Sequence, residues 1–183
     1  MSTTKLTRAS LEAPVSSASS GRRRFALMGA TIDIHATLED TGDTSVIEVG
    51  IPPQFPGVPP HLHEHTTENF YVLEGKIDVL HDGRWRESRR GDFFLFRPGM
   101  VHGYRNSTDQ HARFLIMAPG HDRYYFDLVD WMYREPVWPP HDHDALVAFG
   151  RRHDTIYVGP ATDREAIHAF GSREHTIHDT LYV

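Results

Sequence analysis

The sequence predicts a mostly antiparallel β protein, a barrel or sandwich of about eight or nine short strands, with two helices after it. Short apolar runs broken by turn signals follow one another from residue 25 to residue 119. Strands at this close spacing, with no helical stretch between them, are typical of antiparallel folds. After Gly120 the apolar residues take a helical spacing, which predicts the two helices.

Glycine, proline or a polar turn bounds each predicted strand. TIDIHA (31–36) alternates apolar and polar residues, and TSVIEVG (44–50) follows a turn at 41–43. The proline-rich segment 51–60 cannot pair as an interior strand, so we expect a crossing loop or an edge there. Asp82-Gly83 predicts a tight hairpin. The later strands are expected in ENFYVLEG, KIDVLHD, GDFFLFRPG, VHGYRN and ARFLIMAPG.

The C-terminal part carries two helical patterns. DRYYFDLVDWMYRE places one apolar stripe on a helix, made of Tyr125, Leu128, Val129 and Met132. HDHDALVAFGRRHD predicts a second helix, with Asp142 or Asp144 as N-cap and Arg151, Arg152 and His153 in its last turn. We therefore expect a disordered arm over residues 1–24, a barrel over 25–120, and C-terminal helices and a tail over 121–183 that pack on the barrel or on a partner subunit.

Composition excludes several classes of function. A net charge of -6 disfavours a nucleic-acid partner, and the apolar runs are too short to span a membrane. The chain has no cysteine, so thiolate chemistry is excluded, whereas 14 histidines make imidazole ligands available. RRRFA resembles an export signal, but acids follow too early for an apolar signal core, so we expect a cytoplasmic protein.

The stretch PPHLHEHTTENFYVLEG contains the strongest functional signal. His61, His63 and His65 alternate, so on an extended strand they share one face, and Glu68 begins the next strand in phase with apolar residues. His102 comes from a strand more than thirty residues later. Imidazole and carboxylate ligands together suit Fe, Mn, Co, Ni, Cu or Zn.

Two motifs resemble those of the cupin superfamily. The first runs from Gly57 through the H-x-H pair and Glu68 to Gly75, and the second from Gly91 through His102 to Asn106. The second motif departs from the family pattern at Arg97, where proline is usual, but its glycine-to-histidine spacing is kept. The resemblance, closest to small quercetinase-like cupins, implies a double-stranded β-helix (jelly-roll) barrel that commonly forms a homodimer. It also implies one divalent metal per chain, held by His61, His63, Glu68 and His102.

Other residues have weaker claims to a site. We expect His65 at the rim or entrance of the site, past the end of its strand, with a fourth imidazole ligand as the alternative. Arg97 is expected on the surface, with an anionic substrate group as its alternative partner. Phe70 and Val72 are expected first in the core and second in a pocket wall, and Tyr104 in either. Asp33, His35 and Asn106 are candidates to orient the ligands. HDHD is expected to start a helix rather than to form a second metal site with other C-terminal histidines.

Three functions fit these residues. The leading hypothesis is a dioxygenase that acts on a small aromatic or enolic compound such as a flavonol, with Glu68 as ligand or general base. A non-redox isomerase, cyclase or decarboxylase of a biosynthetic pathway would use the same site. The third reading is a cupin that binds a small molecule without catalysis, which the intact ligand set disfavours.

Overall fold

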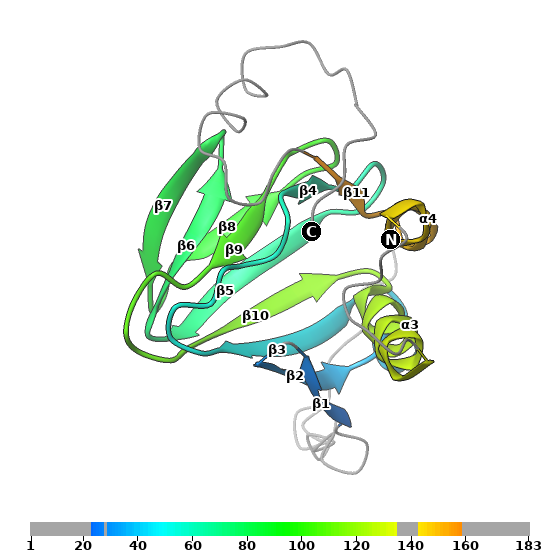
Figure 1. Ribbon diagram of the computed structural model, residues 1–183, viewed down its shortest axis with the longest axis horizontal. Helices are drawn as coiled ribbons and strands as arrows, with labels where there is room; N and C mark the ends of the chain where they lie inside the picture. The colour runs from blue at the N-terminus through cyan, green and yellow to red at the C-terminus, as the bar shows by residue number, and fades with distance from the viewer. Residues whose placement is uncertain (1–22, 28, 135–142, 159–183) are drawn as a thin grey trace, which may run out of the picture.

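The computed structural model describes residues 23–27, 29–134 and 143–158, and its architecture is a cupin-type antiparallel barrel, as the sequence predicted (Figure 1). Most of the expected arm over 1–24 and the tail after residue 158 lie outside the described residues. The strands are β1 (Arg23–Leu27), β2 (Ala30–Ala36), β3 (Ser45–Ile51), β4 (His61–Leu62), β5 (Glu68–Glu74), β6 (Lys76–His81), β7 (Arg84–Arg89), β8 (Phe93–Phe96), β9 (Gly103–Arg105), β10 (Ala112–Ala118) and β11 (Ile156–Tyr157).

Three antiparallel sheets make up the β structure. The largest has the order β1-β2-β3-β10-β5-β8, and a three-stranded sheet has the order β7-β6-β9. The third sheet joins β11 to β4, so the last described strand returns to the strand that carries the histidine motif. The Asp82-Gly83 hairpin is confirmed, since His81 pairs with Arg84 and both turn residues have positive φ, 51° and 70°.

Alternation along the strands places one face of each sheet in the core. Ile47, Val49 and Ile51 of β3 are each 0% exposed, and the outward residues between them are partly exposed. The aromatic rings of Phe70 and Phe114 pack at 5.3 Å between centroids at the centre of the barrel. This aromatic layer lies directly beneath the histidine cluster, because Phe70 also contacts His102.

The helices differ in one respect from the expectation. The two C-terminal helices are α3 (His121–Arg134) and α4 (His143–Arg152), and the α3 residues Tyr125, Leu128 and Val129 are buried as predicted. The expectation of no helix between the strands is wrong, because the one-turn helix α2 (Leu38–Thr41) separates β2 from β3. Its signal is local: Thr37 and Asp40 form a capping box that satisfies backbone N–H groups at the helix start.

Candidate metal centre

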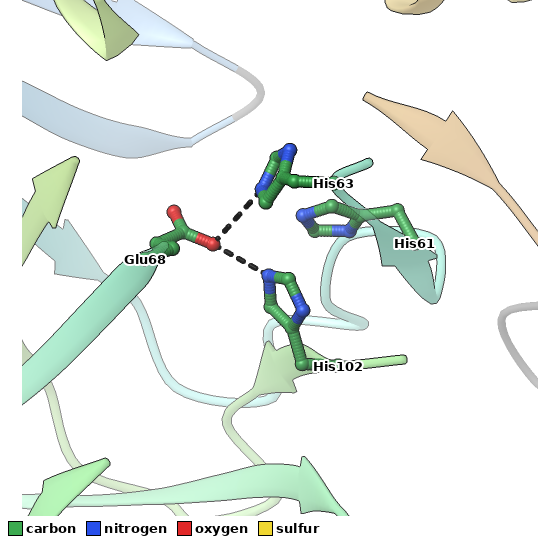
Figure 2. Close-up of side chains that lie close together, drawn as sticks. All are labelled: His61, His63, Glu68 and His102. Carbon is green, nitrogen blue, oxygen red and sulfur yellow. Dashed lines mark hydrogen bonds and ion pairs between the residues drawn. The ribbon is translucent and has the colours of Figure 1, made fainter. Parts of the chain in front are cut away.

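Three neighbouring backbone segments deliver the predicted ligands (Figure 2). His61 and His63 come from β4 and the residue after it, and Glu68 is the first residue of β5. His102 precedes β9 and forms an antiparallel bridge with His61, in which each N–H donates to the other's carbonyl at 2.9 and 2.8 Å. The bridge fixes the distance between the two sequence motifs, so that His61 and His102, which lie far apart in the chain, converge on one point.

The four side chains form a compact, buried group. One ligand atom from each of His61, His63, Glu68 and His102 lies within 4.8 Å of every other. Glu68 Oε2 lies 2.5 Å from Nε2 of His102 and 3.2 Å from Nε2 of His63. Exposure ranges from 8% for His61 to 1% for Glu68 and His102, so bulk water is largely excluded from the group.

Backbone carbonyls hold the outer nitrogen of every histidine in the group. The Nδ1 of His61 lies 2.8 Å from the Pro59 oxygen, and that of His102 lies 2.9 Å from the Met100 oxygen. The Nδ1 of His63 lies 2.6 Å from the oxygen of Asp154, which follows α4. Since a carbonyl only accepts, each Nδ1 carries a proton and donates it. Each imidazole is therefore held with Nε2 toward Glu68 and its neighbours.

The electrostatics of the group are dominated by the single carboxylate. Burial, helped by the two neighbouring imidazoles, lowers the pKa of His61 well below its ordinary value. Burial also lowers the pKa of His63, but hydrogen bonding to Glu68 outweighs this and the net shift is upward. For Glu68, burial alone would raise the pKa, yet interaction with His121 and close contacts with His102 and His63 hold the pKa well below its usual range.

This donor set fits a divalent cation. In a neutral imidazole whose Nδ1 is protonated, Nε2 carries only a lone pair. For both His63 and His102, that nitrogen lies within hydrogen-bonding distance of the same Glu68 oxygen. Two lone pairs facing each other repel unless a cation lies between them, and either a proton or a metal ion meets that need. Imidazole and carboxylate are ligands that divalent transition metals accept.

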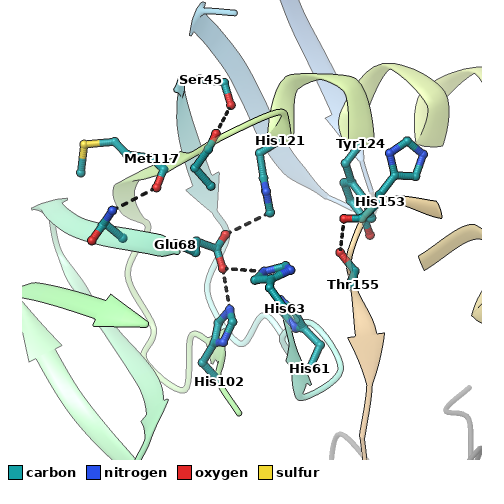
Figure 3. Close-up of polar contacts among 12 residues, drawn as sticks. Ser45, His61, His63, Glu68, His102, Met117, His121, Tyr124, His153 and Thr155 are labelled. Atoms are coloured by element: carbon teal, nitrogen blue, oxygen red, sulfur yellow. Dashed lines mark hydrogen bonds and ion pairs between the residues drawn. The ribbon is translucent and has the colours of Figure 1, made fainter. Parts of the chain in front are cut away.

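His121, which the sequence did not single out, completes the surroundings of Glu68 (Figure 3). It is the first residue of α3, and its Nε2 lies 3.1 Å from Glu68 Oε1, the oxygen that faces away from the other histidines. Both side chains are buried, with exposures of 9% and 2%. The histidine has no motif around it and stands just beyond the barrel sequence. Only the packing of α3 against the barrel identifies it.

Aromatic side chains surround the group. The ring of Phe96 stacks on His102 at 4.3 Å, and that of Phe70 meets it edge-on at 6.0 Å. Tyr104 is buried and hydrogen-bonds to Tyr125 of α3. Burial raises the pKa of both phenols, so both stay neutral and able to donate a proton in a hydrogen bond.

The other predicted residues occupy different positions. Phe70 and Val72 are fully buried in the core, Tyr104 faces the barrel interior, and both His65 and Arg97 are exposed. Arg97 stands on the turn that ends β8, and Gly99 of that turn donates its N–H to the His63 carbonyl at 2.7 Å. The side chains of the HDHD segment and the histidines after residue 158 lie outside the described residues.

The three candidates for orienting the ligands have partners of their own. Asp33 forms an ion pair with Arg24, and His35 lies 3.0 Å from Glu48. Asn106 donates to the carbonyls of Pro52 and Gln110, which ties the loop before β10 to the segment after β3. The contacts of Asn106 therefore stabilise the barrel loops.

A barrel with a buried group of three histidines and one glutamate is typical of a cupin-type fold with a candidate metal centre, and comparison with known proteins supports the fold. Residues 47–118 match a family described as Cupin domain (Cupin_2). This match assigns residues 47–118 to the cupin superfamily. The matched residues include all four members of the group.

Individual relatives cover only parts of the chain. Over 79 residues it is 30% identical to a quercetin 2,3-dioxygenase of Bacillus subtilis (strain 168), which is 43% of this chain and 23% of the relative. Over 63 residues it is 32% identical to an uncharacterized protein of Aquifex aeolicus (strain VF5), which is 34% of this chain and 52% of the relative. The matches thus span about a quarter to a half of these curated relatives.

Among solved structures, the polyketide cyclase RemF from Streptomyces resistomycificus is 26% identical with a TM-score of 0.48, covering 55% of this chain and 75% of that one. Within the part of the chain that the structure describes, no helix is both long and apolar enough to cross a membrane.

Proposed function

We propose that the protein is a metal-dependent oxygenase that acts on a small aromatic or enolic compound. The observation that carries this proposal is the buried set of three imidazole nitrogens and one carboxylate oxygen within 4.8 Å, enclosed by aromatic side chains. The partial similarity to a quercetin 2,3-dioxygenase supports the same reaction class.

In this proposal His61, His63 and His102 hold the metal together with Glu68. The bound divalent metal supplies Lewis acidity and a fixed point for a substrate oxygen. The backbone carbonyls at Pro59 and Met100 keep two of the imidazoles in the ligating tautomer before any metal arrives. The conformational entropy of these side chains is thus lost during folding, and metal binding costs little further entropy.

Glu68 serves as a ligand in preference to a general base. A carboxylate whose pKa is held well below its usual range is ionised at neutral pH and takes up a proton only weakly. Its Oε1 accepts the His121 N–H, which leaves Oε2 toward the histidines. Among the roles open to a buried carboxylate, charge compensation of a cation fits these contacts best.

The surrounding rings set the class of substrate. Phe96 and Phe70 place apolar rings beside His102, and the hydrogen-bonded pair of neutral phenols, Tyr104 and Tyr125, has one O–H left to donate. A flat, oxygen-bearing compound such as a flavonol matches both features, since rings stack on rings and hydroxyl or carbonyl oxygens accept from phenols.

Elemental analysis of the purified protein, followed by oxygen-uptake measurements with flavonols and other enols, tests the proposal. We expect about one divalent metal per chain and uptake that disappears in His102→Ala. Turnover that continues unchanged without dioxygen would replace the oxygenase with a non-redox isomerase, cyclase or decarboxylase. A protein that neither contains metal nor gains thermal stability when metal is added would be a non-enzymatic binding module.

A further inference from the structure

Asp154 contacts the segment that begins at His63 through both its backbone carbonyl and its carboxylate. Its backbone oxygen lies 2.6 Å from His63 Nδ1. Its carboxylate accepts the backbone N–H groups of the next three residues, Glu64 at 2.9 Å, His65 at 3.0 Å and Thr66 at 2.8 Å. One residue beyond the barrel strands thus binds both a predicted metal ligand and the backbone that follows it.

The backbone around Asp154 is itself held firmly. Asp154 has a φ of 54°, in the left-handed region that aspartate tolerates better than most residues. The N–H of Thr155 donates to the Gly150 carbonyl at 2.9 Å, which anchors the turn to the end of α4. Ile156, two residues after Asp154, pairs with Leu62, the residue just before His63. Asp154 is therefore fixed against β4 from both sides.

The carboxylate of Asp154 is committed to the backbone. Together with Glu64 and His65 it forms a second group of potential metal ligands, partly exposed at the surface. However, both oxygens already accept N–H groups, one from Glu64 and two from the next residues. Together with a side-chain hydrogen bond from Thr66, these bonds take up the roughly four lone-pair sites of the carboxylate, so the contacts describe a clamp on the chain.

We propose that Asp154 is a positioning residue for the metal centre, holding His63 in the tautomer and orientation that ligate. The inference rests on the proposed function, since it takes the buried group to be a metal site. The carbonyl fixes the His63 ring, and the carboxylate fixes the backbone from which that ring projects. Removal of the carboxylate frees the backbone of residues 64–66. The His63 ring then no longer keeps its Nδ1 at hydrogen-bonding distance from the Asp154 carbonyl. Contacts of this kind typically change metal affinity about 10- to 100-fold.

The test is a titration of metal-free protein with Co²⁺, followed by visible absorption. Asp154→Gly removes the carboxylate and keeps the left-handed backbone accessible, and Asp154→Asn replaces one acceptor oxygen with an NH₂ group. Asp82 provides the matched control, because it also has a positive φ, 51°, and lies in the exposed β6–β7 hairpin. Asp82→Gly and Asp82→Asn make the same chemical changes in the same backbone conformation away from the centre.

We expect the dissociation constant for Co²⁺ to rise about 10- to 100-fold in Asp154→Gly, with an altered absorption spectrum, and to stay at the wild-type value in both Asp82 variants. The spectrum separates positioning from general destabilisation, because loss of stability alone leaves the Co²⁺ environment unchanged. Should Asp154→Gly fail to fold, Asp154→Asn carries the test, with weaker binding again expected.

Wild-type affinity and spectrum in the Asp154 variants would overturn the inference while leaving the proposed metal centre intact. If the wild-type protein itself takes up no Co²⁺, the proposed function and this inference fall together.

Discussion

Replacement of His121 by leucine removes the N–H group that holds Glu68 Oε1. The two atoms are 3.1 Å apart, and exposures of 9% and 2% leave little water to replace the lost hydrogen bond. A hydrogen bond to a buried charged group contributes about 1.5–3 kcal/mol. Since about 1.4 kcal/mol corresponds to a factor of ten, the loss is equivalent to about 10- to 150-fold in an equilibrium constant.

We expect most of this loss to fall on metal binding. A ligating carboxylate must keep one orientation, and the His121 contact holds Oε1 so that Oε2 faces the other histidines. The assay is a Co²⁺ titration of metal-free wild-type protein and His121→Leu, with thermal melting of both metal-free proteins to measure any effect on folding. The dissociation constant of His121→Leu should rise by up to about 150-fold.

His121→Gln is the matched variant, because its side-chain amide can present an N–H near the position of the imidazole Nε2. It should recover a large part of the lost affinity. Unchanged affinity in His121→Leu would refute the reasoning. Equal weakening in the leucine and glutamine variants would assign the effect to packing at the start of α3 and none of it to the hydrogen bond.

Three further predictions concern the centre and the barrel. His63→Ala should lose bound metal on elemental analysis and His65→Ala should retain it, because only His63 belongs to the buried group. The pKa of His63 is raised above its ordinary value, so this side chain carries an extra proton in the metal-free protein near pH 6.5. A metal ion must displace that proton to bind. The affinity for metal should therefore fall as the pH falls through this pKa. Calorimetry in two buffers of different ionisation enthalpy should detect at least one released proton in that range, and none would contradict the assignment. Gly57→Ala should be strongly destabilised in thermal melting, since a Cβ there meets the Tyr104 carbonyl at a φ of 102°, whereas Gly42→Ala, with φ 84° and open space, should lose less stability.

Local patterns were enough to predict most of the barrel. The alternation of buried and exposed residues in β3 and β10 depends on neighbours a few residues apart, as does the Asp82-Gly83 turn. Such features can be predicted from the sequence alone. The short helix α2 was missed although its capping box is local, because four residues give too little periodicity to stand out. Strand β11 has only two residues and exists because β4 offers it a partner.

The sequence by itself determined the members of the candidate centre, because two motifs carry His61, His63, Glu68 and His102 at fixed spacings on strands whose side chains alternate. The tertiary structure decided what surrounds them. The Asp154 contact with His63 joins residues 91 positions apart, and His121 reaches Glu68 only because α3 packs back on the barrel. No local periodicity encodes such contacts, since they depend on how the C-terminal elements dock and not on the residues beside them in the chain.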